Sequence, residues 1–551
     1  MSLRNFVALS AIAVSLAFLA GCSSSSSVTP PPTGGFTNAN LNGAYVFSVA
    51  GTDVDGTPYA MVGSFTANGE GGNGTGGISA GSIDISCLDT TLFPNSVANL
   101  SLNTSSSSYT VGVDGRGKAH LVTSTATVAG TIVLDFVLQD SSHGLVTEFD
   151  EFGSGSGTLD VQTASVTPNG TYAFSFSGAN ASGAAFATVG EFTVSGGLIS
   201  SGGFEDYNAG GIPYPDAASA ALTLNGTVVA GPASSPATVL STTDFPGLTF
   251  DVYPIDANHL KFIEIDSTGT LEGDAYSQTS TSMPVGALPF TLFGLSANGP
   301  IAAGGFMVTD STNDVTNAST YDINNAGSGN FSSPASAFSG GYSTSVSTPG
   351  RYTLGLTAFV GSSYVAYPSS AGLFILENDG VNIESGIAYA NPTAGAAVNG
   401  GQGFGFNLTG DNLANGVEVD DIAEFSTVSS GASFSGKIDE NFDGNTELGA
   451  GFNQALAGNY GQLDATGRGL LSTGTNVVNT LNGGFAVNYY PVDGVTFPFI
   501  EMDGGQVAAG VFVQQDASAS AAVAAKASAK HLFIARPLIH GRAAKSKPMH
   551  K

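Results

Sequence analysis

The feature that most constrains the fold of this chain is a fourfold internal repeat. Glu-x-Asp occurs at Glu148/Asp150, Glu264/Asp266, Glu377/Asp379 and Glu501/Asp503, so successive copies are 116, 113 and 124 residues apart. Each copy is followed by a glycine and then by an amide, at Gly157/Gln162, Gly273/Gln278, Gly386/Asn391 and Gly510/Gln515. A period of this length exceeds one propeller blade or one solenoid coil, which predicts four domain-sized units.

Alternating apolar and small residues predict that each unit is built from β-strands. In Tyr45-Val-Phe47-Ser-Val49 and Phe404-Gly-Phe406-Asn-Leu408, large apolar side chains occupy every second position. No convincing helical pattern precedes residue 517, and the repeat length accommodates about eight to ten strands per unit. We therefore expect an all-β protein of four antiparallel meanders in series, each a small up-and-down barrel or, alternatively, a sandwich.

The predicted organisation has seven parts. They are a signal peptide (1–21), a tether (22–35), unit 1 (36–163), unit 2 (164–280), unit 3 (281–395), unit 4 (396–516) and an Ala-rich basic tail (517–551). Ser23 to Ser27 and three prolines make the tether flexible, because such a segment has no residues with which to build a core.

Three further landmarks recur in the units. The first, after the opening strand, is Gly63-Ser-Phe65, Gly190-Glu-Phe192, Gly304-Gly-Phe306 or Ala423-Glu-Phe425. Asp-x-Asn follows at Asp206/Asn208, Asp322/Asn324 and Asp439/Asn441, with Asp84-Ile-Ser86 in unit 1. Arg116, Arg351 and Arg468 lie near the middle of units 1, 3 and 4, and are candidate partners for the repeated glutamates.

We interpret the Glu-x-Asp motif as structural. The Asp lies where a strand gives way to a turn and is expected to cap that turn, while the Glu shares its strand face and is expected to be partly buried. A repeated metal or ligand site and a catalytic carboxylate pair are the alternatives. Glycosidase carboxylates flank a substrate and usually come from different strands, which argues against the second alternative.

One acidic loop is the candidate metal site. Asp439, Asn441, Asp443, Asn445 and Glu447 place oxygen ligands at alternating positions around Gly444, which resembles the start of a calcium-binding loop. Ala450 stands where an EF-hand has its bidentate glutamate, so calcium would need a ligand from elsewhere. An acidic β-turn without metal is the alternative.

No catalytic residue is predicted. Gly77-Ile-Ser79-Ala-Gly81 matches the pattern of a nucleophile elbow, but that motif requires a strand-to-helix turn. We interpret His120, His143 and His259 as occupying non-equivalent positions in the repeats, and no two of them have the spacing of metal ligands. Cys87 lies in an apolar stretch and is expected to be a buried, inert thiol.

The distribution of charge limits the partners of the body. Residues 23–516 contain all 43 acidic residues and only six Lys or Arg, while the last 26 residues contain seven basic ones. An acidic body repels nucleic acid and attracts divalent cations, so we expect no nucleic-acid partner.

The N-terminus resembles that of bacterial lipoproteins. Arg4 and the apolar stretch Phe6 to Phe18 form an export signal too short to span a membrane as a helix, and Leu19-Ala20-Gly21-Cys22 resembles a lipobox. The resemblance implies cleavage before Cys22 and lipidation of its sulfur, and Ser23 implies transfer to the outer membrane. The repeats resemble those of uncharacterised tandem-repeat envelope lipoproteins. This resemblance is one of architecture and implies no activity.

These observations favour a monomeric, non-enzymatic lipoprotein on the periplasmic or outer face of the outer membrane. It would bind an envelope polysaccharide or surface polymer, or act as a spacer, because duplicated modules suit weak multivalent binding. A small-ligand carrier that uses the barrel interiors is the first alternative. A hydrolytic enzyme with its site in one diverged unit is the second.

Overall fold

The structure is a computed structural model of the 551-residue chain. It describes residues 35–518 apart from 73, 89–96, 125–129, 164–166, 200–202, 216–219, 231–237, 243–246, 330–334, 346, 391, 394–395, 430, 443, 445–452 and 474–483. The signal peptide, Cys22, most of the tether and residues 519–551 of the tail therefore lie outside the described residues. All the sheets belong to one compact part of the chain, Pro31–Lys551.

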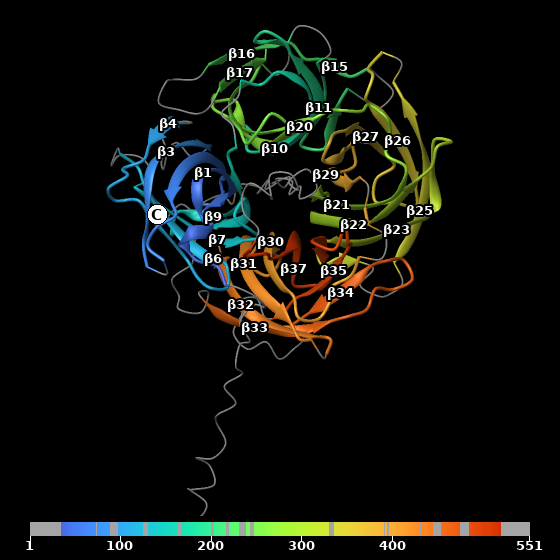
Figure 1. The fold of residues 1–551 in the computed structure, drawn as a ribbon. Helices are drawn as coiled ribbons and strands as arrows, with labels where there is room; N and C mark the ends of the chain where they lie inside the picture. The colour runs from blue at the N-terminus through green and yellow to red at the C-terminus, as the bar shows by residue number, and fades with distance from the viewer. Residues whose placement is uncertain are drawn as a thin grey trace, which may run out of the picture. The chain divides into compact units, whose positions relative to one another are not determined.

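The regular secondary structure of the described residues is almost entirely β, as the strand periodicity predicts. The one short helical segment is a 3₁₀ turn, η1 (Asn38–Asn40), in which the Thr37 side chain caps the first N–H groups. Neighbouring strands pair antiparallel throughout, and the four sheets follow one another along the chain (Figure 1).

Unit 1 is a closed barrel. Strands β1, β2, β3, β5, β6, β7, β8 and β9 form the closed ring of eight, and β4 pairs with β3 outside it. The strand bounds are β1 Asn42–Asp53, β2 Pro58–Asn68, β3 Gly76–Cys87, β4 Val97–Ser101, β5 Ser108–Val111, β6 Arg116–Val122, β7 Thr131–Leu138, β8 His143–Glu148 and β9 Gly153–Val161.

Unit 2 is the irregular copy. Its eleven strands follow the order β12-β16-β17-β18-β19-β20-β10-β11-β13-β14, with β15 on β13, and the pairings among its described strands leave the sheet open. The bounds are β10 Gly170–Asn180, β11 Ala185–Val194, β12 Leu198–Ile199, β13 Phe204–Ala209, β14 Ile212–Tyr214, β15 Leu222–Thr223, β16 Gly226–Ala230, β17 Thr238–Thr242, β18 Thr249–Pro254, β19 His259–Glu264 and β20 Gly269–Ser277.

Unit 3 repeats the topology of unit 1, again with one short strand, β24, outside a closed ring of eight. Its strands are β21 Gly286–Ser296, β22 Gly299–Thr309, β23 Asp314–Asn325, β24 Ser328–Gly329, β25 Ser336–Thr344, β26 Tyr352–Thr357, β27 Ser363–Pro368, β28 Gly372–Glu377 and β29 Ile383–Tyr389.

Unit 4 is the simplest closed barrel, with eight strands in chain order. They are β30 Gly403–Asn412, β31 Val417–Thr427, β32 Ser433–Phe442, β33 Gln454–Tyr460, β34 Gly469–Ser472, β35 Ala486–Tyr489, β36 Thr496–Glu501 and β37 Gln506–Gln514. The barrel alternative is therefore correct for units 1, 3 and 4, because antiparallel neighbours joined by short turns remove both sheet edges by closing.

Aromatic side chains pack the interior of unit 4. The ring centroids of Phe404 and Phe425 are 5.1 Å apart, and those of Phe497 and Phe512 are 4.9 Å apart. Phe406 lies between Phe485 and Phe499, at 5.5 and 4.9 Å. These distances are typical of packed aromatic cores, so the described interior favours a structural core over a carrier cavity.

The register of unit 3 differs from the predicted landmark by one residue. Phe47 and Phe406 lie opposite Gly63 and Ala423, whereas the equivalent Phe290 lies opposite Gly305. Met307, two residues on, therefore packs in the barrel core, and Phe306 packs outside it. Adjacent glycines made the two registers look alike in the sequence, although a slip of one residue exchanges the two faces of a strand.

The four units pack against one another, which the sequence left open. Apolar clusters join unit 1 to unit 2 around Val62 and Tyr253, and unit 2 to unit 3 around Val189 and Tyr367. Others join unit 3 to unit 4 through Phe293 and Tyr490, and unit 4 to unit 1 through Ile422 and Val137. Because unit 4 also packs on unit 1, the contacts form a closed cycle. We name these interfaces the first, second, third and fourth junctions, in that order.

Candidate functional site at the junctions between units

The aspartates of the Glu-x-Asp motif form turns in all four units. Asp150, Asp266, Asp379 and Asp503 each accept a hydrogen bond through Oδ1 from the backbone N–H two residues on, at 2.8–3.0 Å. In units 1 to 3 the other oxygen accepts the N–H of a residue 17 positions earlier, Val133, Thr249 or Ser362. This is the geometry of an Asx turn that also ties two loops together.

The glutamates of the motif are fully buried carboxyl groups. Glu148, Glu264, Glu377 and Glu501 have no exposed surface. Burial is the main cause that raises the pKa of Glu264 to about 9 and of Glu377 to about 10, and it raises the pKa of the other two well above its ordinary value. The neighbouring Asp of the motif raises the pKa further in each case. Values of about 9 and 10 favour the protonated form of Glu264 and Glu377 at neutral pH.

The glycine of the motif is required by close backbone approach. A Cβ at Gly157 would lie 1.9 Å from Ser48 O, and one at Gly273 would lie 2.2 Å from Ser175 O. The distances are 2.1 Å at both Gly386 and Gly510, to Thr291 O and Asn407 O. In each unit the last strand thus pairs so tightly with the first that no side chain fits.

The amide of the motif reaches into the next unit. Gln162 and Gln278 donate from Nε2 to Pro254 O and Pro368 O, at 2.7 and 3.0 Å. Gln515 of unit 4 donates to Leu138 O of unit 1 at 2.9 Å, so the pattern passes through the fourth junction. Asn391, the amide of unit 3, lies outside the described residues.

The Asp-x-Asn motif makes the complementary contact. Asn208, Asn324 and Asn441 donate from Nδ2 to backbone carbonyls at the Glu-x-Asp turn of the next unit, including Glu377 O, Glu501 O and Glu148 O. The distances are 3.3, 3.1 and 2.7 Å. Each Asn therefore holds the turn of a neighbouring unit, which connects the two repeated motifs in space.

At three junctions the Asp of the same motif pairs with an arginine of the next unit. Asp206 meets Arg351 through two contacts of 2.8 and 2.5 Å, and Asp322 meets Arg468 at 2.5 Å. Asp439 meets Arg116 at 3.1 Å across the fourth junction. The sequence correctly singled out these arginines, but their ion-pair partners are aspartates of the preceding unit in the cycle and not the repeated glutamates.

Three tyrosines complete the junctions and were missed in the sequence. Tyr253, Tyr367 and Tyr490 donate their hydroxyls to Asp84, Asp206 and Asp322, at 2.6, 2.5 and 2.9 Å. The repeated Tyr-Pro dipeptide at 253–254, 367–368 and 490–491 is the signal that could have found them. Val137 takes this position at the fourth junction.

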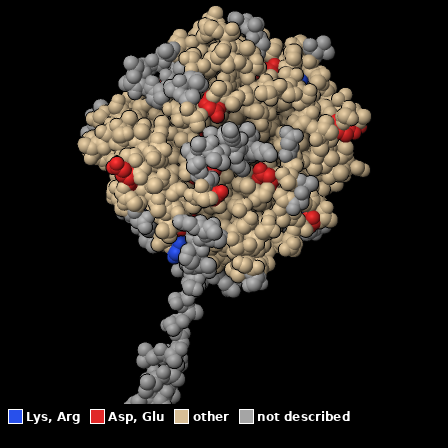
Figure 2. Space-filling view, viewed as in Figure 1, with Lys and Arg blue, Asp and Glu red and all other residues tan. Residues whose placement is uncertain are grey.

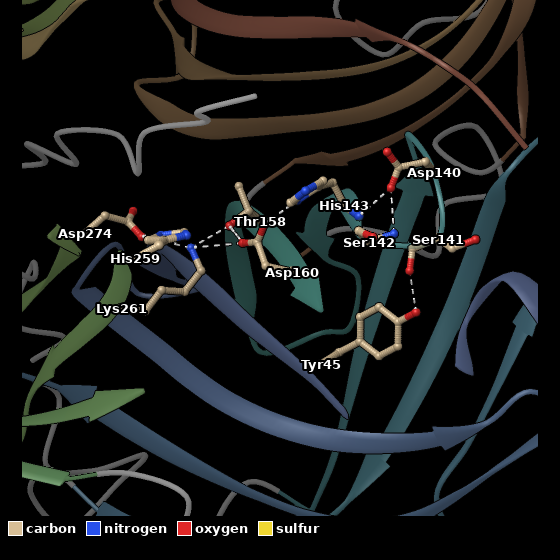
Figure 3. A network of polar contacts seen from close by, with 10 residues as sticks. All are labelled: Tyr45, Asp140, Ser141, Ser142, His143, Thr158, Asp160, His259, Lys261 and Asp274. Atoms are coloured by element: carbon tan, nitrogen blue, oxygen red, sulfur yellow. Dashed lines mark hydrogen bonds and ion pairs between the residues drawn. The ribbon is translucent and has the colours of Figure 1, made fainter. Parts of the chain in front are cut away.

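The first junction contains the densest network of ionisable groups (Figure 3). Lys261 of unit 2 is 1% exposed and lies 3.5 Å from Asp160 of unit 1 and 3.1 Å from Asp274. His143 contacts Asp160 at 2.9 Å, and His259 contacts Asp274 at 2.6 Å. Figure 3 shows Asp160 between His143 and Lys261, so one carboxylate serves both units.

The electrostatics of this network favour fixed charges. Burial opposes ionisation of Asp160 and Asp274, but Lys261 and the histidines outweigh it and hold both carboxyl pKa values below normal. Burial lowers the pKa of His143, yet the hydrogen bond and charge of Asp160 produce a net increase. Burial likewise lowers the pKa of Lys261, while Asp274 and Asp160 produce a net increase.

The two histidines of this network stand at equivalent positions, contrary to the sequence interpretation. Each lies five residues before the Glu of its unit and begins the strand that ends there, β8 or β19. His120 lies instead on β6, where burial and the nearby Lys118 lower its pKa. The equivalence was hidden because the residues between His and Glu differ in the two units.

The acidic loop of unit 4 is only partly described. Asp439 is engaged with Arg116, and Asn441 donates to Glu148 O and Gly153 O, so both serve the fourth junction. Asp443, Asn445 and Glu447 lie outside the described residues. Within the described part of the chain, no group of three or more His, Cys, Asp or Glu is arranged to hold a metal ion.

The remaining candidate residues lie in regular strands. Ser79 is on β3, where its hydroxyl donates to Thr66 O at 3.3 Å, so Gly77–Gly81 is strand rather than an elbow. Cys87 ends the same strand, is buried and forms no disulfide within the described part of the chain.

Burial changes the meaning of the acidic composition. Of the 43 acidic residues, 23 are buried, and burial raises the pKa of several of them, such as Asp135 and Glu205 to about 7 and Glu384 to about 8. Asp and Glu are few and scattered on the face seen in Figure 2. The surface therefore carries fewer carboxylates than the composition suggests.

Comparison with known proteins gives no family. No family model matches the chain, and no curated protein matches it. Two mutant forms of the vaccine antigen transferrin binding protein B from Haemophilus parasuis Hp5 align with it among solved structures. The alignments cover 73% and 86% of this chain and 82% and 94% of those chains, each at 11% identity and a TM-score of 0.17. A likeness at this TM-score carries no inference.

The described residues contain no helix with the length and apolar character needed to cross a bilayer.

Proposed function

We propose that this protein is a non-enzymatic outer-membrane lipoprotein that binds a neutral envelope polysaccharide. The lipid on Cys22 would supply the anchor, and the cycle of docked units would supply a rigid platform. The observation that carries the binding role is an exposed apolar surface at the second junction, which we name the 212–214/381 patch after its residues.

The 212–214/381 patch is formed by two units. Ile212 and Tyr214 belong to β14 of unit 2 and are 68% and 53% exposed, while Val381 follows the Glu-x-Asp motif of unit 3 and is 64% exposed. The two segments touch, because Asn378 Nδ2 donates to Pro215 O at 3.1 Å. Clustered exposed apolar side chains are typical of binding surfaces, whereas isolated ones are normal.

A stack of three rings supports Tyr214. Tyr207 lies 5.4 Å from Tyr214 at an interplanar angle of 17°, and Phe186 lies 5.2 Å from Tyr207 at 16°. Phe186 and Tyr207 are buried, so the outer ring is held in place before any ligand arrives. A fixed aromatic face with a hydroxyl at its edge suits a sugar ring, which presents C–H groups on its face and hydroxyls around it.

Co-sedimentation tests this function. The mature chain is mixed with purified cell envelopes and with insoluble neutral polysaccharides, and the pelleted fraction is compared with that of Tyr214→Ser and Val381→Ser. We expect both variants to lose pelleting, because each removes part of the patch from a different unit. Val229→Ser is the matched control, since Val229 is 54% exposed in unit 2 and lies outside the patch.

The possible results separate binding from spacing. Failure of the wild-type chain to pellet with every polymer would leave a spacer role and overturn polysaccharide binding. Equal loss in the Val229→Ser control would show a general surface effect. Cys22→Ser, followed by membrane fractionation, tests the anchor separately: release of the variant is expected, and full retention would contradict lipid anchoring.

A further inference from the structure

Among the described residues, the first junction has no counterpart of the arginine that neutralises the other three. In units 1, 3 and 4 an arginine stands at the start of β6 or directly before β26 or β34. The next strand along the chain bears Val137 or Tyr367, or is followed directly by Tyr490. Strand β17 holds this place in unit 2, and the residue before it in the sequence is Ala237. No guanidinium therefore comes from this position to Asp84, the unit 1 equivalent of Asp206, Asp322 and Asp439.

A second acid faces Asp84 instead. Asp251 of β18 is 1% exposed, Asp84 has no exposed surface, and the two carboxyls lie within hydrogen-bonding reach of each other. Tyr253 Oη donates to Asp84 Oδ2 at 2.6 Å, and Asn99 N donates to Asp84 Oδ1. Neither oxygen of Asp251 receives a hydrogen bond from a donor in the described residues.

Further buried oxygens around this pair are also unsatisfied. Ser82 lies two residues before Asp84 on the same face of β3 and is 1% exposed, and its Oγ lies close to the Tyr253 hydroxyl without meeting strict hydrogen-bond geometry. The side-chain oxygen of Asn99 is buried and unpartnered among the described residues. The surrounding apolar cluster, which includes Val62, Ile255 and Ile263, makes uncompensated charge costly.

We infer that a calcium-class divalent cation binds between Asp84 and Asp251 and replaces the guanidinium found at the other junctions. All the unsatisfied atoms are oxygens. Two carboxylates together with hydroxyl and amide oxygens form the kind of ligand set that calcium prefers, because calcium is a hard cation that binds about six or more oxygens. A single shared proton would satisfy only one oxygen pair and leave a net negative charge in the apolar cluster. A cation satisfies several oxygens at once and joins unit 1 to unit 2.

This site differs from the acidic loop of unit 4, and the two can be separated by variants. Calcium binding by the full mature chain in detergent is measured by calorimetry, and Tb³⁺ emission excited through tyrosine serves as an optical probe. The chain has no Trp, so the tyrosine nearest the ion dominates the sensitised emission. We expect Asp251→Asn to weaken binding by at least about tenfold.

Asp443→Asn is the matched control, because it removes one carboxylate from the unit 4 loop and leaves the first junction unchanged. Tyr253→Phe keeps the ring and should reduce Tb³⁺ emission even if Asp251→Asn folds poorly. Absence of calcium binding by the wild-type chain, or equal affinity of Asp251→Asn, would overturn the inference and leave a shared proton between the carboxyls. Loss of the only binding in Asp443→Asn would also overturn it.

Discussion

The first and second junctions are equivalent interfaces between units, but they bury different charged groups. At the second junction Asp206 lies between Arg351 and Tyr367, so one buried carboxylate meets one buried guanidinium. At the first junction Asp84 keeps the tyrosine but faces Asp251, and the cation, Lys261, lies elsewhere among Asp160, Asp274 and two histidines. The repeated backbone is therefore compatible with more than one arrangement of charge.

The comparison teaches which parts of the repeat are tied to geometry. The asparagine, glutamine and glycine positions serve backbone atoms, whose places are set by the strands, and they recur in almost every unit. The ion pairs join two side chains, so both partners can be replaced together without a change in the backbone. Unit 2, which has the open sheet and lacks the arginine, is also the unit that brings the lysine.

Removal of the guanidinium at the second junction should have the largest effect on stability. Arg351→Met leaves Asp206 buried without its charge partner, and we expect a loss of about 3–5 kcal/mol in the free energy of unfolding. Urea denaturation followed by circular dichroism measures it. Arg116→Met is the matched comparison, because Arg116 is 16% exposed and its loss should cost less than that of Arg351. Equal losses would show that burial does not distinguish the junctions.

The lysine of the first junction provides the next test. Lys261→Met leaves Asp160 and Asp274 without their shared cation, and we expect a loss of about 3 kcal/mol. The pKa of His143 should rise further, because Lys261 is one of the charges that lower it. Titration by NMR of the His143 ring measures this shift. A pKa of His143 that is unchanged in the variant would contradict the coupling across this junction.

The asparagine that holds the fourth junction should have a smaller effect. Asn441→Ala leaves Glu148 O and Gly153 O without their donor, and the cost of such buried carbonyls is about 1–3 kcal/mol. Chemical denaturation again measures it, with exposed Asn415→Ala as the control. If the two variants were equally stable, closure of the cycle through unit 4 would contribute nothing to stability.

The buried glutamates predict a pH dependence with a definite sign. The pKa of Glu264 is raised from 4.5 to about 9, so the folded chain retains a proton that the unfolded chain has lost between these values. Its stability contribution is therefore complete below pH 4.5 and is lost as pH rises through about 9. Glu264→Gln should flatten the fall by up to about 1.4 kcal/mol per pH unit, while exposed Glu70→Gln should not. A steeper fall in the Glu264→Gln variant would contradict this assignment.

Several features of the fold could be predicted because they depend on local patterns. The alternation of large apolar and small residues in Tyr45–Val49 and Phe404–Leu408 predicted strands, and the spacing of the Glu-x-Asp motif predicted the number of units. The turn role expected for Asp150 and its equivalents agrees with the hydrogen bonds they make. Each of these depends on contacts within a few residues or within one hairpin.

Contacts between units could not be predicted in the same way. Asn441 and Glu148 are 293 residues apart, and no local pattern specifies that they meet. The sequence singled out Arg116, Arg351 and Arg468 but offered the repeated glutamates as their partners, because it does not show which barrel faces pack together. The prediction of the register around Met307 was wrong for a related reason, since either of two adjacent glycines could lie opposite Phe290.

The sequence alone determined that this chain is a fourfold β-repeat with recurring acidic, amide and glycine positions, since strand periodicity and turn chemistry are local properties. Only the tertiary structure decided that those positions join the units into a closed cycle, and that more than half of the acids are buried. The physical reason is that ion pairing and burial depend on which surfaces meet, and distant surfaces meet only once the barrels have formed.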